Sequence, residues 1–433
     1  MRTAKIKSTV FYIIVSLIVL AYFFIRLPEL RHAFSVGTTA PYDFPQDYIA
    51  GSQLLAGKSL YPSNFRDMYT SLLSNGGITV DRRITHLNAH PPFTAMLLFP
   101  LWFLSFHNAI FLWGLLTILS ALVISLLLIT SEEIPWQYFP VLFLFILAWP
   151  PFQANLAVGQ TSILVALLVI AGWYFFKKQK ESISGIFIAL ATMLKFYPGL
   201  FMVYFLLNKK YKAFWSSIIS TGIILVLVFV VTRHDFFRFI FHIMPVDAKY
   251  SGADIGNLSI NGFFAKLFLS IKVYYNTGVF AASENYLLKN IFLFITVGLL
   301  LIYSALSMRK YTYDNDIGFS AFIIVSLLLS PICWNHYLTL ILLPLIVFTK
   351  QLIKKSTSYE VIIFLTALFL ISIDNGSIYF QKALTIAHAY IPGNTMSLFY
   401  RLTFFSAQFY GMGLFLYLNF RLIKKYTTNY QER

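Results

Sequence analysis

Long runs of apolar residues recur along nearly the whole chain, separated by short polar segments. The run from Ile223 to Val231 is apolar on every face and lacks the alternation of a membrane β-strand, so it predicts a helix surrounded by hydrocarbon. A helix satisfies its own backbone hydrogen bonds inside lipid. The pattern predicts spanning or re-entrant helices over residues 9–27, 93–106, 109–130, 138–149, 162–176, 183–194, 198–207, 213–231, 291–306, 317–329, 338–348, 361–373 and 397–420.

The composition agrees with this pattern and excludes a soluble globular domain. Of the 433 residues, 58% are hydrophobic and 12% are charged, and the mean hydropathy is +0.72. We expect an all-α polytopic membrane protein with roughly 10–13 transmembrane or re-entrant helices and short interfacial helices in its first external loop. Because no linker or low-complexity tract interrupts the chain, residues 1–433 are interpreted as one membrane domain, motif-rich over 1–231 and more variable over 232–433.

Basic residues gather in short clusters between the apolar runs, which explains the net charge of +16 without a nucleic-acid partner. The positive-inside rule places such clusters in the cytoplasm, so the N-terminus is expected inside and the connections at residues 28–88 and 233–289 outside. The first apolar run has no small-residue cleavage site and is expected to stay as a helix. These signals predict a multi-pass protein of the bacterial plasma membrane. The clusters are Arg2, Lys5 and Lys7; Lys177, Lys178 and Lys180; Lys209, Lys210 and Lys212; Arg309 and Lys310; residues 350–355; and Lys424 and Lys425.

Two parts of the chain cannot be simple crossings if every basic cluster lies on one side of the membrane. Residues 93–106 follow two prolines and contain Pro100, so a re-entrant or interfacial element is expected there. Basic clusters flank residues 183–207 on both sides, which requires an even number of crossings, with the reversal at Pro198. This places Lys195 near the tip of a hairpin, where an ammonium group is costly without an anion to meet it.

Several short polar groups fall on the outer face in this topology and predict a polar cavity that opens away from the cytoplasm. None has the spacing of a zinc site, a Gly-rich phosphate loop or a Ser-His-Asp triad. The single cysteine, Cys333, excludes an intramolecular disulfide. The polar groups are Asp43 with Asp47, His90, Gln160, Lys195, Asn257 with Asn261, and Trp334 with His336.

The order of these motifs resembles glycosyltransferase family 87, integral membrane enzymes of the GT-C superfamily that use polyprenyl-phosphate sugars, typically mannose. The resemblance covers about residues 40–345 and rests on six motifs in the same order. They are Asp-Phe-x-x-x-Tyr-x-Ala-Gly at 43–51, Pro-Pro-Phe at 91–93, Gly-Gln at 159–160, Lys-x-x-Pro at 195–198, Asn-x-Ser-x-Asn-Gly at 257–262 and Ser-Pro-x-x-Trp-x-His at 330–336.

The resemblance implies a GT-C-type bundle and an inverting transferase whose site faces away from the cytoplasm. The first-loop aspartate of the family falls on Asp43, its lysine on Lys195, and its late motif on Trp334 and His336. One departure concerns the second motif, because the family often has Tyr-Pro-Pro where this chain has His90 before its two prolines. This difference is expected to alter donor or acceptor contacts.

The residue types suit this chemistry independently of the resemblance. Direct displacement at an anomeric carbon needs a carboxylate that takes the proton of the acceptor hydroxyl, a role for Asp43 with Asp47 as the second candidate. A lipid-linked phosphate leaves as an anion and needs positive charge, which Lys195 supplies with His336 or His90 as helpers. Gln160, Asn257, Asn261 and Trp334 are the predicted substrate-binding residues. The expected partners are the polyprenyl-phosphate donor, a glycolipid, polysaccharide or protein acceptor, and membrane lipid.

Each assignment has a structural alternative. Asp43 and Asp47 are also typical of residues that cap a surface helix, here one over residues 46–56. Lys195 is also typical of a lysine that snorkels to the membrane interface. The Trp334 and His336 pair is also compatible with a hydrogen-bonded cluster between helices. Gln160, Asn257 and Asn261 are equally compatible with cavity lining or loop turns.

Two other functions fit a polytopic chain with polar groups at its outer face. A lipid-linked polysaccharide polymerase or ligase shares the lipid substrates but is expected to carry large Arg-rich external loops. A lipid or sugar transporter is expected to spread charged residues into the inner half, whereas the acidic residues here gather in external loops. No cofactor is implied, and metal dependence stays open because no cluster of external acids predicts a divalent site.

Overall fold

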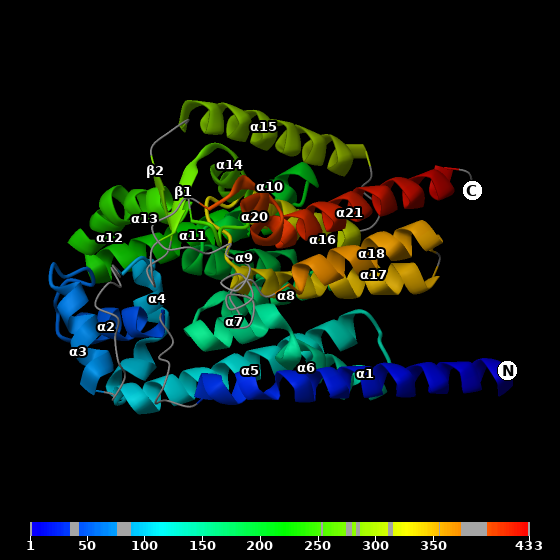
Figure 1. Ribbon diagram of the computed structural model, residues 1–433, viewed down its shortest axis with the longest axis horizontal. Helices are drawn as coiled ribbons and strands as arrows, with labels where there is room; N and C mark the ends of the chain where they lie inside the picture. The colour runs from blue at the N-terminus through cyan, green and yellow to red at the C-terminus, as the bar shows by residue number, and fades with distance from the viewer. Residues whose placement is uncertain are drawn as a thin grey trace.

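Most helices of this computed structural model run along its long axis, and both chain termini lie at one end (Figure 1). We call this the terminal end, and the opposite end, which carries α2, α3, α12 and α13, the loop end. The structure describes residues 2–34, 43–75, 88–252, 254–273, 279–282, 286–310, 315–354, 356–373 and 396–431.

Short and long helices alternate along the chain, with 3-10 turns (η) where the chain bends. The elements of the first half are α1 (Arg2–Phe34), α2 (Phe44–Leu55), α3 (Phe65–Asn75), α4 (Pro92–Leu97), η1 (Phe99–Phe103), α5 (Phe106–Ser131), η2 (Trp136–Tyr138), α6 (Phe139–Ala148), α7 (Pro150–Val158), α8 (Ser162–Lys177), α9 (Glu181–Leu194), η3 (Tyr197–Gly199), α10 (Leu200–Leu207) and α11 (Tyr211–Thr232).

The second half begins with a bent helix at the loop end, whose middle turn η4 is a π-helix. Its elements are α12 (His234–Arg238), η4 (Phe239–Ile243), α13 (Met244–Gly252), α14 (Ile260–Phe268), β1 (Ser270–Val273), β2 (Val279–Ala282), α15 (Tyr286–Lys310), α16 (Asn315–Leu329), η5 (Asn335–Ile341), α17 (Leu342–Lys354), α18 (Ser358–Ile371), α20 (Leu398–Leu402), η6 (Phe404–Ser406) and α21 (Ala407–Gln431). The strands pair as an antiparallel hairpin, with Ser270 opposite Ala282.

The predicted class is confirmed: the protein is an all-α polytopic membrane protein, apart from that hairpin. Among the described residues four helical segments are long and apolar enough to span a membrane, and the bent pair α6 and α7 would make a fifth. Six shorter apolar helices accompany them. The four long segments are Phe106–Ser131, Tyr211–Thr232, Tyr286–Leu306 and Asn335–Ile353.

Three of the predicted runs do not form single straight helices. Residues 93–106 form the short α4 and η1, with Pro100 at the start of η1, as expected of an element that does not cross. The run ending at residue 149 continues through Pro150 into α7 after a bend of 56°. The prediction of one helix over 397–420 is wrong, because the chain breaks at Thr403 between α20 and η6.

The first long connection carries the predicted short helices, α2 and α3. The first turns of α2 are buried against η1 and α5, with Phe44 at 0% exposure, and the interfacial position of both helices stays a prediction. Residues 35–42 and 76–87 of this connection lie outside the described residues.

The reversal expected within residues 183–207 is present. Helix α9 ends at Leu194, η3 holds Pro198, and α10 then runs back toward the terminal end. The hairpin closes at that end through an ion pair of 3.2 Å between Lys210 and Glu181. Lys195 therefore lies at the tip, as predicted.

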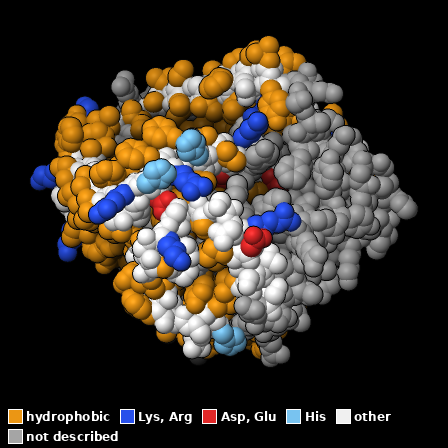
Figure 2. All heavy atoms as spheres, turned by 90° about the vertical axis from the view of Figure 1, so that its left-hand side faces the viewer, with side chains coloured by type: hydrophobic (Ala, Val, Ile, Leu, Met, Phe, Trp, Pro, Cys, Tyr) orange, Lys and Arg blue, Asp and Glu red, His pale blue; other side chains and the backbone are white. Residues whose placement is uncertain are grey.

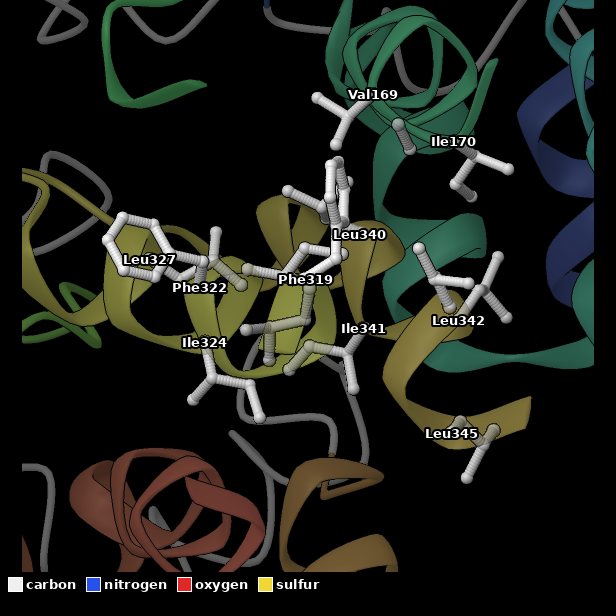
Figure 3. Close-up of a cluster of buried hydrophobic side chains, with 14 of the residues drawn as sticks. Val169, Ile170, Phe319, Phe322, Ile324, Leu327, Leu340, Ile341, Leu342 and Leu345 are labelled. Atoms are coloured by element: carbon white, nitrogen blue, oxygen red, sulfur yellow. The ribbon is translucent and has the colours of Figure 1, made fainter. Parts of the chain in front are cut away.

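Apolar side chains from three segments interlock at the centre of the bundle (Figure 3). Phe319 of α16 and Leu340 of η5 belong to this cluster (Figure 3), and the ring of Phe319 is 4.4 Å between centroids from that of Phe201 of α10. In lipid such packing is driven by close contact, since the surrounding hydrocarbon is as apolar as the core. This core fixes η5, and with it His336 at the start of η5.

The basic clusters are held at the terminal end by acidic partners. Lys177 binds Glu132 at 2.5 Å and Asp316 at 2.7 Å, and Lys350 binds Glu132 at 2.8 Å. Glu360 pairs there with Lys425 at 2.9 Å. The expectation that acidic residues gather in external loops is therefore wrong, because these acids neutralise the lysines at the other end.

Helices α9 and α11 approach each other closely at Gly185. A Cβ atom added there would lie 2.5 Å from the carbonyl oxygen of Ala213 and 2.8 Å from the amide of Ser217. Small residues permit such contacts between membrane helices.

We expect Gly185→Ala to destabilise the protein by about 1–3 kcal/mol, because the methyl group must push the two backbones apart. The measurement is the thermal unfolding midpoint in detergent. Gly222→Ala on α11 is the control, since no described atom lies within 4 Å of its added Cβ. Equal midpoints for the two variants would contradict the close approach.

Candidate active site

Asp43 stands at the start of α2 but does not cap the helix. It occupies the N-cap position without a side-chain bond to the helix backbone. Its Oδ1 accepts a hydrogen bond of 2.9 Å from the side-chain Nε2 of Gln46. Its Oδ2 accepts one of 2.8 Å from the side-chain Nε2 of Gln160. The capping alternative is therefore wrong for this side chain, which is half-buried and held by two carboxamides.

A tight turn after α7 presents Gln160 to Asp43. Gly159 ends α7 in the left-handed region, with φ of +70°, which glycine adopts at little cost. The Trp113 indole donates to the Gly159 carbonyl at 3.1 Å, and the Asp43 amide donates to the Val158 carbonyl at 2.9 Å. The turn is thus fastened to both α5 and the start of α2.

His90 pairs with Asp47, one turn along α2. Its Nδ1 lies 2.8 Å from Oδ1 of Asp47, whose carboxylate is almost fully buried. Burial opposes the charged imidazole, but attraction and hydrogen bonding to Asp47, together with attraction to Asp43, raise the pKa of His90 above its usual value. The Tyr61 hydroxyl donates to the His90 carbonyl at 2.8 Å and fixes the backbone.

Lys195 points inward rather than to the membrane interface. Its Nζ donates to Oε1 of Gln160 at 2.9 Å and lies 3.8 Å from the centroid of the Tyr337 ring. Burial lowers the pKa of Lys195 to about 7, a shift limited by attraction to Asp43 and Asp47. The snorkelling alternative is therefore wrong, because only 8% of the residue is exposed.

One hydrogen-bonded network thus joins five predicted site residues: Asp43, Asp47, His90, Gln160 and Lys195. Figure 2 shows the loop end, where charged and histidine side chains gather around a recess. Asp47 Oδ2 is buried and has no hydrogen-bond partner in the described part of the chain. The network combines carboxylates with cationic groups, as acid–base chemistry on an anionic substrate requires.

His336 lies near this network. It is 8% exposed, interacts electrostatically with Lys195 and His90, and has an Nε2 atom with no hydrogen-bond partner among the described residues. Trp334 is half-buried and packs against Gly256, where a Cβ would lie 2.9 Å from its ring.

Asn257 and Asn261 hold two loops together. The Asn257 amide donates to the carbonyls of Gly252 and Pro331, and its oxygen accepts from the amides of Ser259 and Cys333. Asn261 donates to the same two carbonyls, at 3.3 and 3.1 Å. No hydrogen bond within the described ranges links either asparagine to the network around Gln160, so their predicted role in substrate binding stays a prediction.

Sequence reasoning missed three residues of the site. Gln46 holds Asp43, Tyr337 underlies Lys195, and Asp247 of α13 interacts electrostatically with His90 and Lys195. Only Gln46 had a signal in the sequence. It follows Asp43 by three positions, a spacing that makes two side chains neighbours on a helix. The described residues contain no group of three His, Cys, Asp or Glu side chains arranged to hold a metal ion.

Comparison with known proteins identifies a family. The sequence model of glycosyltransferase family 87 matches residues 88–332, more than half of the chain. The matched region includes His90, Gln160 and Lys195, whereas Asp43 and Asp47 precede it and His336 follows it. No curated protein matches the chain.

Proposed function

The chain belongs to glycosyltransferase family 87, and from this premise we propose that it transfers a hexose, typically mannose, from a polyprenyl-phosphate donor with inversion. The proposed acceptor is a glycolipid, a polysaccharide or a protein at the extracytoplasmic face of the bacterial plasma membrane. The observation that carries the proposal is the network in which Gln160 joins Asp43 to Lys195.

In this proposal Asp43 is the general base. Inversion by direct displacement requires a carboxylate that takes the acceptor proton as the hydroxyl oxygen attacks. Asp43 is the more accessible of the two acids on α2, since Asp47 is only 1% exposed and pairs with His90. Two carboxamide donors fix the plane of the Asp43 carboxylate. Asp47 then acts through His90.

Lys195 is the proposed partner of the donor phosphate. The leaving phosphate is anionic and is stabilised by a preformed positive charge in a site with little water. The Nε2 atom of His336, which has no hydrogen-bond partner among the described residues, offers a further contact to the phosphate. Cationic and neutral donors of this kind suit a phosphate ester without a metal ligand.

The surroundings of Lys195 suit a lipid-linked substrate. Phe196 is 47% exposed and contacts Phe239 at the loop end, with 6.1 Å between ring centroids. Helix α11 precedes α12 and η4 in the chain. Most of its apolar side chains are exposed, as expected for a surface in contact with lipid. An isoprenoid tail on this surface would bring its phosphate to Lys195.

The direct test is transfer by the purified protein in lipid vesicles from radiolabelled polyprenyl-phosphate mannose. We expect product from this donor and none from a nucleotide sugar. Transfer from the nucleotide sugar alone would overturn the proposal. Glycolipid, polysaccharide and protein fractions identify the acceptor.

The lysine clusters of the terminal end support the proposed extracytoplasmic position of the site. Lysine clusters gather there, and α8 leads from Gln160 to Lys177 over about 24 Å, so the network lies at the opposite end. The positive-inside rule then directs the loop end out of the cell.

Labelling of single cysteines tests this orientation. In a Cys333→Ala background, we expect Lys58→Cys at the loop end to react with a membrane-impermeant maleimide in intact cells, since Lys58 is exposed. Lys178→Cys, exposed at the terminal end, is expected to react only after permeabilisation. The reverse result would place the network in the cytoplasm.

A further inference from the structure

The carboxamide of Gln160 can be oriented in only one way. Lys195 is a hydrogen-bond donor at 2.9 Å on one side, and the carboxylate of Asp43 is an acceptor at 2.8 Å on the other. Oε1 must therefore face the ammonium group, and Nε2 must face the carboxylate. This orientation follows from the chemistry of the two neighbours.

The second hydrogen of the Gln160 amide determines the proton position on His90. The Nε2 atoms of Gln160 and His90 are 3.1 Å apart, and the amide nitrogen is a donor only. His90 Nε2 must therefore accept, which leaves its proton on Nδ1, facing Asp47 at 2.8 Å. This pattern gives each of the four hydrogen bonds one donor and one acceptor, with His90 neutral.

The charges around His90 favour the opposite state. Asp43 and Asp47 of α2 and Asp247 of α13 attract a proton to the ring, against burial and the positive charge of Lys195. His336 of η5 also faces it. The net effect raises the pKa of His90, whereas the hydrogen bond from Gln160 requires an unprotonated Nε2.

We propose that Gln160 is a positioning residue that holds His90 in its neutral, Nδ1-protonated form and thereby keeps Asp43 available as a proton acceptor. A protonated His90 would place a second cation beside Asp43 and make its carboxylate a weaker base. The effect on catalysis rests on the proposed function, whereas the protonation of His90 does not. This role is distinct from the substrate contact expected from the sequence, which stays a prediction.

The test variant is Gln160→Met, which keeps the length of the side chain but removes both polar groups. We expect His90 to become protonated at neutral pH. We also expect kcat to fall about tenfold there, the effect of a one-unit change in a proton-transfer equilibrium. The loss should diminish as pH rises through the pKa of His90, because the ring then becomes neutral again. The acid limb of the pH profile therefore moves to higher pH.

A second substitution separates this role from simple damage to the fold. His90→Asn added to Gln160→Met removes the titrating ring, so the acid limb should return toward that of His90→Asn alone. A lower kcat with an unmoved acid limb, or a shift that persists without His90, would overturn the proposal.

Nitrogen-15 NMR of histidine-labelled protein gives a readout that needs no activity. The His90 signal, assigned by its loss in His90→Asn, should report the neutral Nδ1–H form in the wild type and the doubly protonated form in Gln160→Met. If wild-type protein shows no sugar transfer, the proposed function fails while this measurement still decides the protonation state. A doubly protonated His90 in the wild type at neutral pH would overturn the inference.

Discussion

Replacing Asp43 with Asn is expected to lower the rate of sugar transfer by about 10²–10⁴-fold, the usual contribution of a general base. The asparagine side chain has nearly the same size, but it cannot take the proton of the acceptor hydroxyl. Donor affinity is expected to change little, because the donor phosphate is assigned to Lys195. The measurement is transfer from radiolabelled polyprenyl-phosphate mannose at saturating donor.

The matched control is Asp67→Asn, which removes an exposed carboxylate from α3 at the same end of the molecule. It should retain wild-type activity, and both variants should unfold at the wild-type temperature. Unchanged transfer in Asp43→Asn would remove the assignment. Asp47→Asn is then the next variant, because its Oδ2 lacks a described partner and its role would move from positioning to catalysis.

Replacing Lys195 with Met is expected to weaken apparent donor affinity by about 10- to 100-fold, the worth of a hydrogen bond to a charged group. The apolar chain preserves the packing on Tyr337 but removes the ammonium group. The measurement is the donor KM, compared with that of Lys58→Met, an exposed lysine at the same end. An unaltered donor response would show that Lys195 does not meet the phosphate.

The same residue predicts a dependence on pH in the wild type. The pKa of Lys195 is lowered by burial to about 7, so the ammonium form is present below this pH and is lost above it. Donor affinity should therefore decline as pH rises through neutrality. Lys195→Arg, which stays charged, should show a smaller decline. A steeper decline in the arginine variant would contradict the assignment.

Hydropathy and charge predicted the class and most helices because both are local properties of the chain. An apolar run of sufficient length forms a helix in lipid whatever its neighbours are, and prolines interrupt it at positions visible in the sequence. The reversal at Pro198 and the short elements over residues 93–106 were predicted in this way. The break at Thr403 was not, because no proline or glycine marks it.

The types of the residues indicated which positions to consider for the site, but not the role of each one. The sequence placed Asn257 among the substrate-binding residues, and its contacts also fasten the loop after α13 to the loop before η5. An asparagine in a loop motif suits both uses, and only its partners distinguish them. The same holds for Asp43, whose N-cap position on α2 conceals a side chain turned toward Gln160.

By itself, the sequence determined that this is a helical membrane protein with lysine clusters and a set of polar motifs typical of one transferase family. Tertiary structure alone decided how those motifs interact. Gln160 bonds to Asp43, His90 and Lys195, which are 117, 70 and 35 positions away in the sequence. The reason is physical. Helix formation depends on neighbours along the chain, whereas a hydrogen bond depends on a separation of about 3 Å that only the packed bundle establishes.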